Sequence, residues 1–183
     1  MCCNWLNKVI SDKKLNNQQP APTVLDYGCG SAILGLAALK YGAHSASGVD
    51  IDIESLESAR RNCQANNLHM DLYMTSDNDS PESWPISVTG IDLETSSHKK
   101  IKELSKQFDI TVANILAPIL ISLVEELASK TKSNGLVALS GLVLKQSEDV
   151  IKYYQKYFDD VTIEASEDDW VLITGIRNNN LCK

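Results

Sequence analysis

The sequence lacks the cysteine and histidine spacings that mark disulfide frameworks and zinc sites. Its five cysteines are odd in number, irregularly spaced and without a C-x-x-C pair, and its three histidines are scattered. We therefore expect no metal site. We also expect a reducing compartment inside the cell, either the cytoplasm or the interior of an organelle such as a mitochondrion or plastid.

Long apolar runs are also missing. The most apolar stretch, residues 110–124, is interrupted by polar residues and a proline and is too short to span a bilayer. The N-terminus has no cationic segment followed by an apolar run, which a secretory signal requires. We therefore expect neither a membrane-bound nor a secreted protein.

Positive charge is scarce. Lysine and arginine number 17 against 24 aspartates and glutamates, which gives a net charge of −7. Direct nucleic-acid binding needs a basic surface, so this balance argues against it. A basic protein is the macromolecular partner that the charge favours.

Apolar residues alternate between strand and helix spacing along most of the 183 residues, which predicts one α/β domain with a mostly parallel sheet. Residues 75–105 lack any such pattern, and we expect a loop insertion there. An antiparallel pair of strands is expected to close the sheet. The expected strands cover residues 23–26, 45–51, 69–74, 108–113, 135–142, 161–164 and 170–176. The expected helices lie near residues 5–10, 34–41, 52–63, 118–127 and 150–158.

A glycine turn follows the first expected strand, and an acid follows the second. Gly28 and Gly30 allow the backbone to approach a ligand closely, and the helix after them presents free N–H groups. Asp50 ends the second strand, where a carboxylate can accept hydrogen bonds from a ribose diol. Ligands of open parallel sheets bind at such strand ends, so the pattern predicts an adenosine-containing cofactor.

The residues around this turn favour S-adenosylmethionine over a nicotinamide dinucleotide. The third glycine of a dinucleotide loop would fall at Ile33. Asp26, two residues before Gly28, suits the cationic amino-acid end of S-adenosylmethionine. A structural alternative remains, in which Asp26 and Asp50 only cap adjacent turns.

Five sequence blocks resemble those of the ribosomal protein L11 methyltransferases (PrmA) and their eukaryotic relatives. The blocks are Leu25-Asp26-Tyr27-Gly28-Cys29-Gly30-Ser31, Gly48-Val49-Asp50-Ile51-Asp52, Val112-Ala113-Asn114-Ile115-Leu116-Ala117, Leu139-Ser140-Gly141-Leu142, and Asp169-Trp170 with Gly175. The first two occur in many methyltransferases, whereas the block around Asn114 is more specific.

The resemblance implies a Rossmann-like seven-stranded methyltransferase fold with strand order 3-2-1-4-5-7-6, in which the seventh and last strand of the chain is antiparallel. It implies an S-adenosylmethionine-dependent enzyme that methylates lysine or amino-terminal amines of a protein, such as a basic ribosomal protein. The cofactor-binding residues would be Asp26, Gly28, Gly30, Asp50, Ile51 and Asn114.

The family resemblance gives Asn114 and Ile115 the catalytic role. The Asn114 side-chain oxygen and the Ile115 carbonyl would accept hydrogen bonds from the N–H groups of the substrate amine, and so direct its lone pair at the methyl group of the cofactor. The structural alternative is that Asn114 ends a strand and caps the next helix.

Two departures from the family pattern affect these expectations. Ala32 stands where a further glycine is expected, so its methyl group would meet the methionine part of the cofactor. The family's Gly-Thr-Gly-x-His-x-Thr-Thr segment and N-terminal recognition domain have no counterpart before Cys2. We expect a catalytic core that binds cofactor weakly and methylates poorly alone. A small-molecule amine methyltransferase and a non-catalytic methyltransferase fold are the alternatives.

Overall fold

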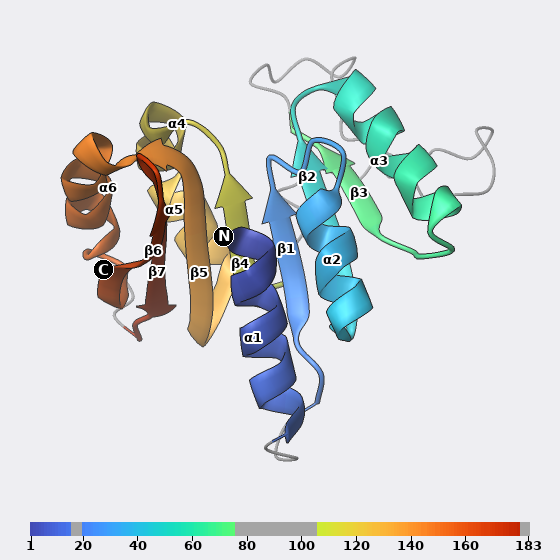
Figure 1. The fold of residues 1–183 in the computed structure, drawn as a ribbon, viewed down its shortest axis with the longest axis horizontal. Helices are drawn as coiled ribbons and strands as arrows, with labels where there is room; N and C mark the ends of the chain where they lie inside the picture. Colours follow the sequence, from blue (N-terminus) through green and yellow to red (C-terminus); the bar gives the residue numbers. More distant parts are fainter. Residues whose placement is uncertain (16–19, 76–105, 180–183) are drawn as a thin grey trace.

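The computed structural model describes residues 1–15, 20–75 and 106–179, and these build a seven-stranded sheet with helices on both faces (Figure 1). The strand order is β3-β2-β1-β4-β5-β7-β6, and β7 runs antiparallel to both of its neighbours. This confirms the predicted fold class and strand order. The strands are β1 (Thr23–Tyr27), β2 (Ser45–Asp50), β3 (Asp71–Met74), β4 (Phe108–Asn114), β5 (Thr131–Val143), β6 (Phe158–Glu167) and β7 (Trp170–Arg177).

The helices divide between two hydrophobic clusters, one on each face of the sheet. The first cluster contains side chains of α1, α2 and α3, and the second contains side chains of α4, α5 and α6. The helices are α1 (Cys2–Leu15), α2 (Ile33–Tyr41), α3 (Ile53–Ala65), α4 (Ala117–Ser122), α5 (Val124–Lys130) and α6 (Ser147–Tyr154), with a 3₁₀ turn η2 (Leu144–Gln146) before α6. The parallel core of the sheet is thus covered on both sides, as parallel sheets require.

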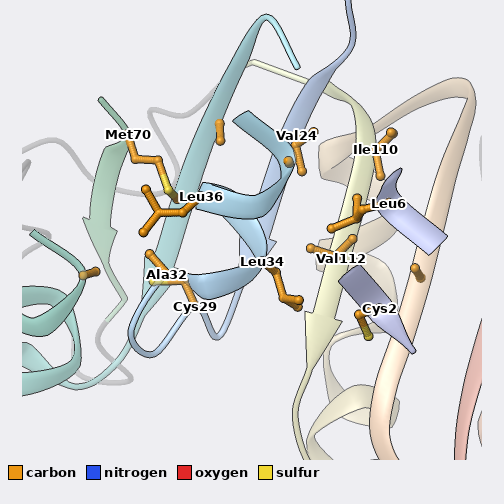
Figure 2. Close-up of a cluster of buried hydrophobic side chains, with 14 of the residues drawn as sticks. Cys2, Leu6, Val24, Cys29, Ala32, Leu34, Leu36, Met70, Ile110 and Val112 are labelled. Carbon is orange, nitrogen blue, oxygen red and sulfur yellow. The ribbon is translucent and has the colours of Figure 1, made fainter. Parts of the chain in front are cut away.

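Figure 2 shows how α1 and α2 pack on the first face of the sheet. Leu6 of α1 lies against the centre of β4, close to Ile110 and Val112, and all three side chains are fully buried. Ala32 belongs to the same cluster and is also fully buried. Its methyl group therefore contributes to the core and is not exposed at the rim of the glycine turn.

Helix α2 ends and α3 begins where the sequence predicts. Gly42 has φ +100° and its N–H closes the last turn of α2, a conformation that favours glycine. The Asp52 side chain caps α3 by accepting hydrogen bonds from the backbone N–H groups of Glu54 and Ser55. These two boundaries are set locally, which is why sequence patterns find them.

The predicted helix after Pro118 is wrong in one respect, because it is two helices, α4 and α5, with a break at Leu123. The fully buried Tyr154 hydroxyl donates a hydrogen bond of 2.9 Å to the Leu120 carbonyl. In a continuous helix that carbonyl would accept from the N–H of Val124. A contact 34 residues away along the chain therefore accompanies the break.

Other differences concern element ends. Phe158, expected on the last helix, is the first residue of β6, and β5 begins at Thr131 rather than near residue 135. Residues 76–105 lie outside the described residues. The insertion at 75–105 and the assignment of residues 1–183 to one domain therefore stay predictions. Within the described residues, no helix has the length and apolar character needed to cross a bilayer.

Asp109 joins three strands at the edge of the sheet opposite the glycine turn. One carboxylate oxygen accepts hydrogen bonds from the Thr23 N–H at 2.9 Å and the Thr23 hydroxyl at 2.7 Å, and the other accepts from Lys132 Nζ at 2.9 Å. Partial burial alone would raise the pKa of Asp109, but these donors outweigh it and the pKa is lowered. The ionised carboxylate therefore stabilises the alignment of β1, β4 and β5.

We expect Asp109→Asn to lower the free energy of unfolding by about 1–2 kcal/mol, because it removes the charge from these hydrogen bonds. The pKa of Asp109 is lower in the folded than in the unfolded chain, so its contribution is complete above about pH 5 and is lost as the pH falls through about 4 and below. Urea unfolding at pH 7 and at pH 3 measures this. The exposed Asp159→Asn variant is the control, and an equal loss of stability at both pH values would contradict the prediction.

Candidate functional site

The candidate site lies at the carboxyl ends of β1, β2, β4 and β5. β1 lies between β2 and β4 (Figure 1). The chain builds the sheet from β1 through β2 to β3 in one direction and then continues from β4 in the other direction, so the strand order reverses at β1. Open α/β sheets bind ligands at such a switch point. The residues predicted from the sequence lie at the ends of β1, β2 and β4 and in the turns that follow these strands.

The glycine turn after β1 is fastened to the end of β2. The N–H groups of Gly28 and Cys29 both donate to the carbonyl of Val49, at 2.7 and 2.9 Å. Gly28, Gly30 and Ala32 all have positive φ angles, of 74°, 52° and 65°. A side chain at Gly30 would meet no atom within 4 Å, so the turn leaves open space on its outer side.

Asp50 holds this turn from the end of β2. Its Oδ2 accepts a hydrogen bond of 2.8 Å from the Gly30 N–H, and its Oδ1 accepts one of 3.0 Å from the Asp52 N–H. Each carboxylate oxygen has capacity for a further donor. The next side chain, Ile51, is 58% exposed although it is large and apolar. The end of β2 therefore offers a carboxylate acceptor beside an open apolar surface.

Asp26 lies beneath the turn and only 1% of it is exposed. Its Oδ2 accepts a hydrogen bond of 2.9 Å from the N–H of Gly35 in α2. The pKa of Asp26 is raised to about 7, mainly by burial and in part by the negative charge of Asp50, while the hydrogen bond from Gly35 opposes the rise. The Asp26 carboxyl group is therefore buried beneath the turn, with one oxygen held by α2.

Asn114 ends β4 with an exposed side chain, beside a hollow of about 570 Å³. The N–H of Ile115 donates to the carbonyl of Ser140 at 3.1 Å, which fixes the peptide after Asn114. The hollow is lined by Met1, Asn114, Ile115, Leu116, Ser140, Gly141, Glu167, Asp168 and Trp170. Backbone carbonyls, an amide, carboxylates and a half-exposed tryptophan therefore surround one open space.

The structure brings most of the predicted residues to one edge of the sheet. A Cβ at Gly28 would collide with the Ile115 side chain, so the glycine turn and the turn after β4 are in contact. The contribution of Glu167, Asp168 and Trp170 to the hollow was not predicted. The sequence signal for it was a tryptophan directly after an acidic turn between two expected strands.

Metal chemistry has no structural support among the residues that are described. No group of three His, Cys, Asp or Glu side chains there could hold an ion. Cys2, Cys3, Cys29 and Cys63 are all free thiols. Burial raises the pKa of the Cys29 thiol in the glycine turn, so this thiol is neutral.

Comparison with known proteins gives consistent matches. Residues 1–178 match the family model "Ribosomal protein L11 methyltransferase (PrmA)". The chain is 38% identical over 177 residues to the ribosomal protein L11 methyltransferase of Neisseria gonorrhoeae, a match that covers 97% of this chain and 48% of that protein. It is 35% identical over 179 residues to the Shewanella halifaxensis protein of the same name, with 97% and 50% covered.

Among solved structures, the ribosomal protein L11 methylase of Lactobacillus delbrueckii subsp. bulgaricus superimposes with a TM-score of 0.70 at 26% identity. That match covers 95% of this chain and 78% of the other. The chain spans about half the length of the curated relatives it matches. Fold, strand order and sequence agree, and the chain belongs to the ribosomal protein L11 methyltransferase (PrmA) family.

Proposed function

We propose that this chain is the catalytic part of an S-adenosylmethionine-dependent protein N-methyltransferase that acts on a lysine or amino-terminal amine. The observation that carries the proposal is the contact between two turns. The turn after β1 is held by Asp50, and it touches the turn after β4 that bears Asn114 and Ile115. A cofactor site and an amine site are thereby adjacent.

The residues present fit S-adenosylmethionine. The free acceptor capacity of Asp50 suits a ribose diol, and the exposed Ile51 suits one face of an adenine ring. The space in front of Gly30 leaves room for the sugar and the chain attached to it. A dinucleotide loop has a third glycine that lets its helix pack closely on the strand, whereas this chain has Ile33 at that position.

When bound, the cofactor supplies an electrophilic methyl group, which passes to nitrogen as its bond to sulfur breaks and the bonding pair stays on sulfur. The protein's part is to hold an uncharged amine in line with that bond. The Asn114 side-chain oxygen and the Ile115 carbonyl accept hydrogen bonds from the two N–H groups of the amine, so the lone pair of its nitrogen points at the methyl group. The amine gives its extra proton to water before it enters.

The substrate class follows from charge and from the relatives. Glu167 and Asp168 line the hollow, and the chain carries a net charge of −7, so a cationic protein segment is attracted to its mouth. The relatives are named for ribosomal protein L11, and we propose that protein or a similar basic one as the partner. The free thiols of the described cysteines support a reducing compartment within the cell.

Radiolabelled methyl transfer tests the proposal. The protein is incubated with methyl-labelled S-adenosylmethionine and purified ribosomal protein L11, and label is expected in the protein fraction. Label that leaves on dialysis would instead indicate a small-molecule amine as substrate. Failure to bind S-adenosylmethionine at all would indicate a non-catalytic methyltransferase fold.

Replacing Asp50 tests the cofactor site. We expect Asp50→Ala to weaken binding of S-adenosylmethionine about ten- to a hundredfold. The substitution removes hydrogen bonds to a charged acceptor, and these bonds are worth roughly 1.5–3 kcal/mol. Calorimetry measures the affinity. Asp52→Ala is the matched control, since it loses the α3 cap but keeps the Asp50 carboxylate. Unchanged affinity in Asp50→Ala, or tight binding of a nicotinamide dinucleotide, would refute the assignment.

Replacing Asn114 separates binding from catalysis. We expect Asn114→Ala to keep cofactor affinity within about twofold and to lower turnover by at least about tenfold, because the lost oxygen orients the amine. The exposed Asn66→Ala variant controls for loss of an amide elsewhere. Equal turnover in Asn114→Ala and the parent would return Asn114 to a structural role at the end of β4.

Asp26 gives a prediction about pH. Its pKa of about 7 implies that the carboxyl group is largely protonated at pH 6 and ionised at pH 8. A cationic ligand nearby favours the ionised form, so S-adenosylmethionine should bind more tightly as the pH rises through 7. If binding lowers the pKa by one unit, the gain is about fivefold between pH 6 and pH 8 and about tenfold over the whole titration.

Calorimetry at pH 6 and pH 8 measures this change. The affinity for S-adenosylhomocysteine, which has no sulfonium charge, is expected to change less between these two pH values. The Asp26→Asn variant is expected to show a nearly flat profile, because its amide can still accept from Gly35 but does not ionise. A parent-like pH profile in Asp26→Asn would assign the titration to a group other than Asp26.

A further inference from the structure

β5 contains an irregularity directly beside the proposed amine site. Leu139 pairs with Ile173 and Leu142 pairs with Val171, so β5 has one more residue than β7 over this stretch. The extra residue falls at Ser140–Gly141, and Gly141 has φ +84°. This is a β-bulge with glycine at a positive φ, a device that redirects a strand and is common next to active sites.

The Ser140–Gly141 bulge contacts the peptide groups on both sides of Ile115. The Ser140 carbonyl accepts the Ile115 N–H at 3.1 Å. A Cβ built on Gly141 would lie 2.6 Å from the Ile115 carbonyl oxygen and 2.8 Å from the Ile115 nitrogen. These are backbone atoms, which cannot rotate away as a side chain can. Only glycine therefore allows the bulge to lie this close to the turn.

The bulge is itself held in place from the other side. The Ser140 hydroxyl, which is buried, donates to the carbonyl of Val171 in β7 at 3.1 Å. The absent side chain of Gly28 makes room for the Ile115 side chain. Ile115 therefore packs against two glycines, Gly141 of β5 at its backbone and Gly28 of the turn after β1 at its side chain.

We propose that the Ser140–Gly141 bulge positions the Ile115 carbonyl as an amine acceptor, and that Gly141 is a positioning residue because its missing side chain leaves that oxygen open to the hollow. This rests on the proposed function. Ser140, Gly141 and Ile115 all line the hollow, so the proposed acceptor residue borders the space that an amine would occupy. Any side chain at position 141 would cover the oxygen or rotate its peptide.

Amide hydrogen exchange tests the positioning without any ligand. We expect the Ile115 amide to exchange at least about tenfold faster in Gly141→Ala than in the parent, because the shifted peptide loses its hydrogen bond to Ser140. Gly42→Ala is the matched control. Gly42 also has a positive φ, of 100°, but it ends α2 away from the turn after β4. Equal exchange at Ile115 in the two variants would overturn the proposal.

Binding of a substrate mimic tests the consequence. N-acetyl-lysine methylamide is titrated into the protein saturated with S-adenosylhomocysteine. We expect Gly141→Ala to weaken binding of this amine at least about tenfold, while the Kd of S-adenosylhomocysteine stays within about twofold. Gly42→Ala is expected to change neither dissociation constant. Unchanged amine binding in Gly141→Ala would overturn the proposal.

A milder pair of variants applies if Gly141→Ala does not fold. Ser140→Ala removes the hydrogen bond to Val171 together with the hydrogen bond to the Cys2 thiol, and Ser140→Thr keeps a hydroxyl there. We expect Ser140→Ala to weaken binding of the amine severalfold and to speed exchange of the Ile115 amide. Ser140→Thr is expected to restore both the affinity and the exchange rate. Equal affinities and equal exchange rates in the two variants would contradict the proposal. Failure of the parent to bind S-adenosylhomocysteine counts against the proposed function alone, because exchange at Ile115 is measured without ligand.

Discussion

The hydrogen bond between the Gly30 N–H and Asp50 Oδ2, 2.8 Å long, is the interaction on which the site depends. It joins the turn after β1 to the end of β2 across 20 residues of chain, and it uses a carboxylate that remains partly open to a ligand. The two turns that follow β1 and β4 then meet through Gly28 and Ile115. The proposed cofactor and substrate positions are thereby tied to neighbouring strands of one sheet.

Much of the fold was predictable because its signals are local. Alternating strand and helix spacing gave the α/β class, Gly42 gave the end of α2, and Asp52 gave the start of α3. The family resemblance added the strand order, which periodicity alone does not contain. Asp50 and Asn114 were predicted to lie at the ends of strands, and the parallel pairing of β1, β2 and β4 brings those ends to one edge.

The features that escaped prediction depend on contacts between distant parts of the chain. The break between α4 and α5 coincides with a hydrogen bond from Tyr154, and the bulge in β5 is seen only against its pairing with β7. The direction of the Asp26 carboxyl group depends on how α2 packs over β1. Spacing places an acid near a turn, but only packing decides which side of the turn its side chain faces.

The acceptor that we propose at Ile115 is a main-chain oxygen, and this has a consequence for how the family can vary. A main-chain group is present whatever residue occupies position 115, so substitution there changes packing but cannot delete the acceptor. Selection for the chemistry then acts on position 141, where a single added carbon would come within 2.6 Å of that oxygen. Gly141 contributes no functional group, and yet we expect its identity to vary least among members of the family.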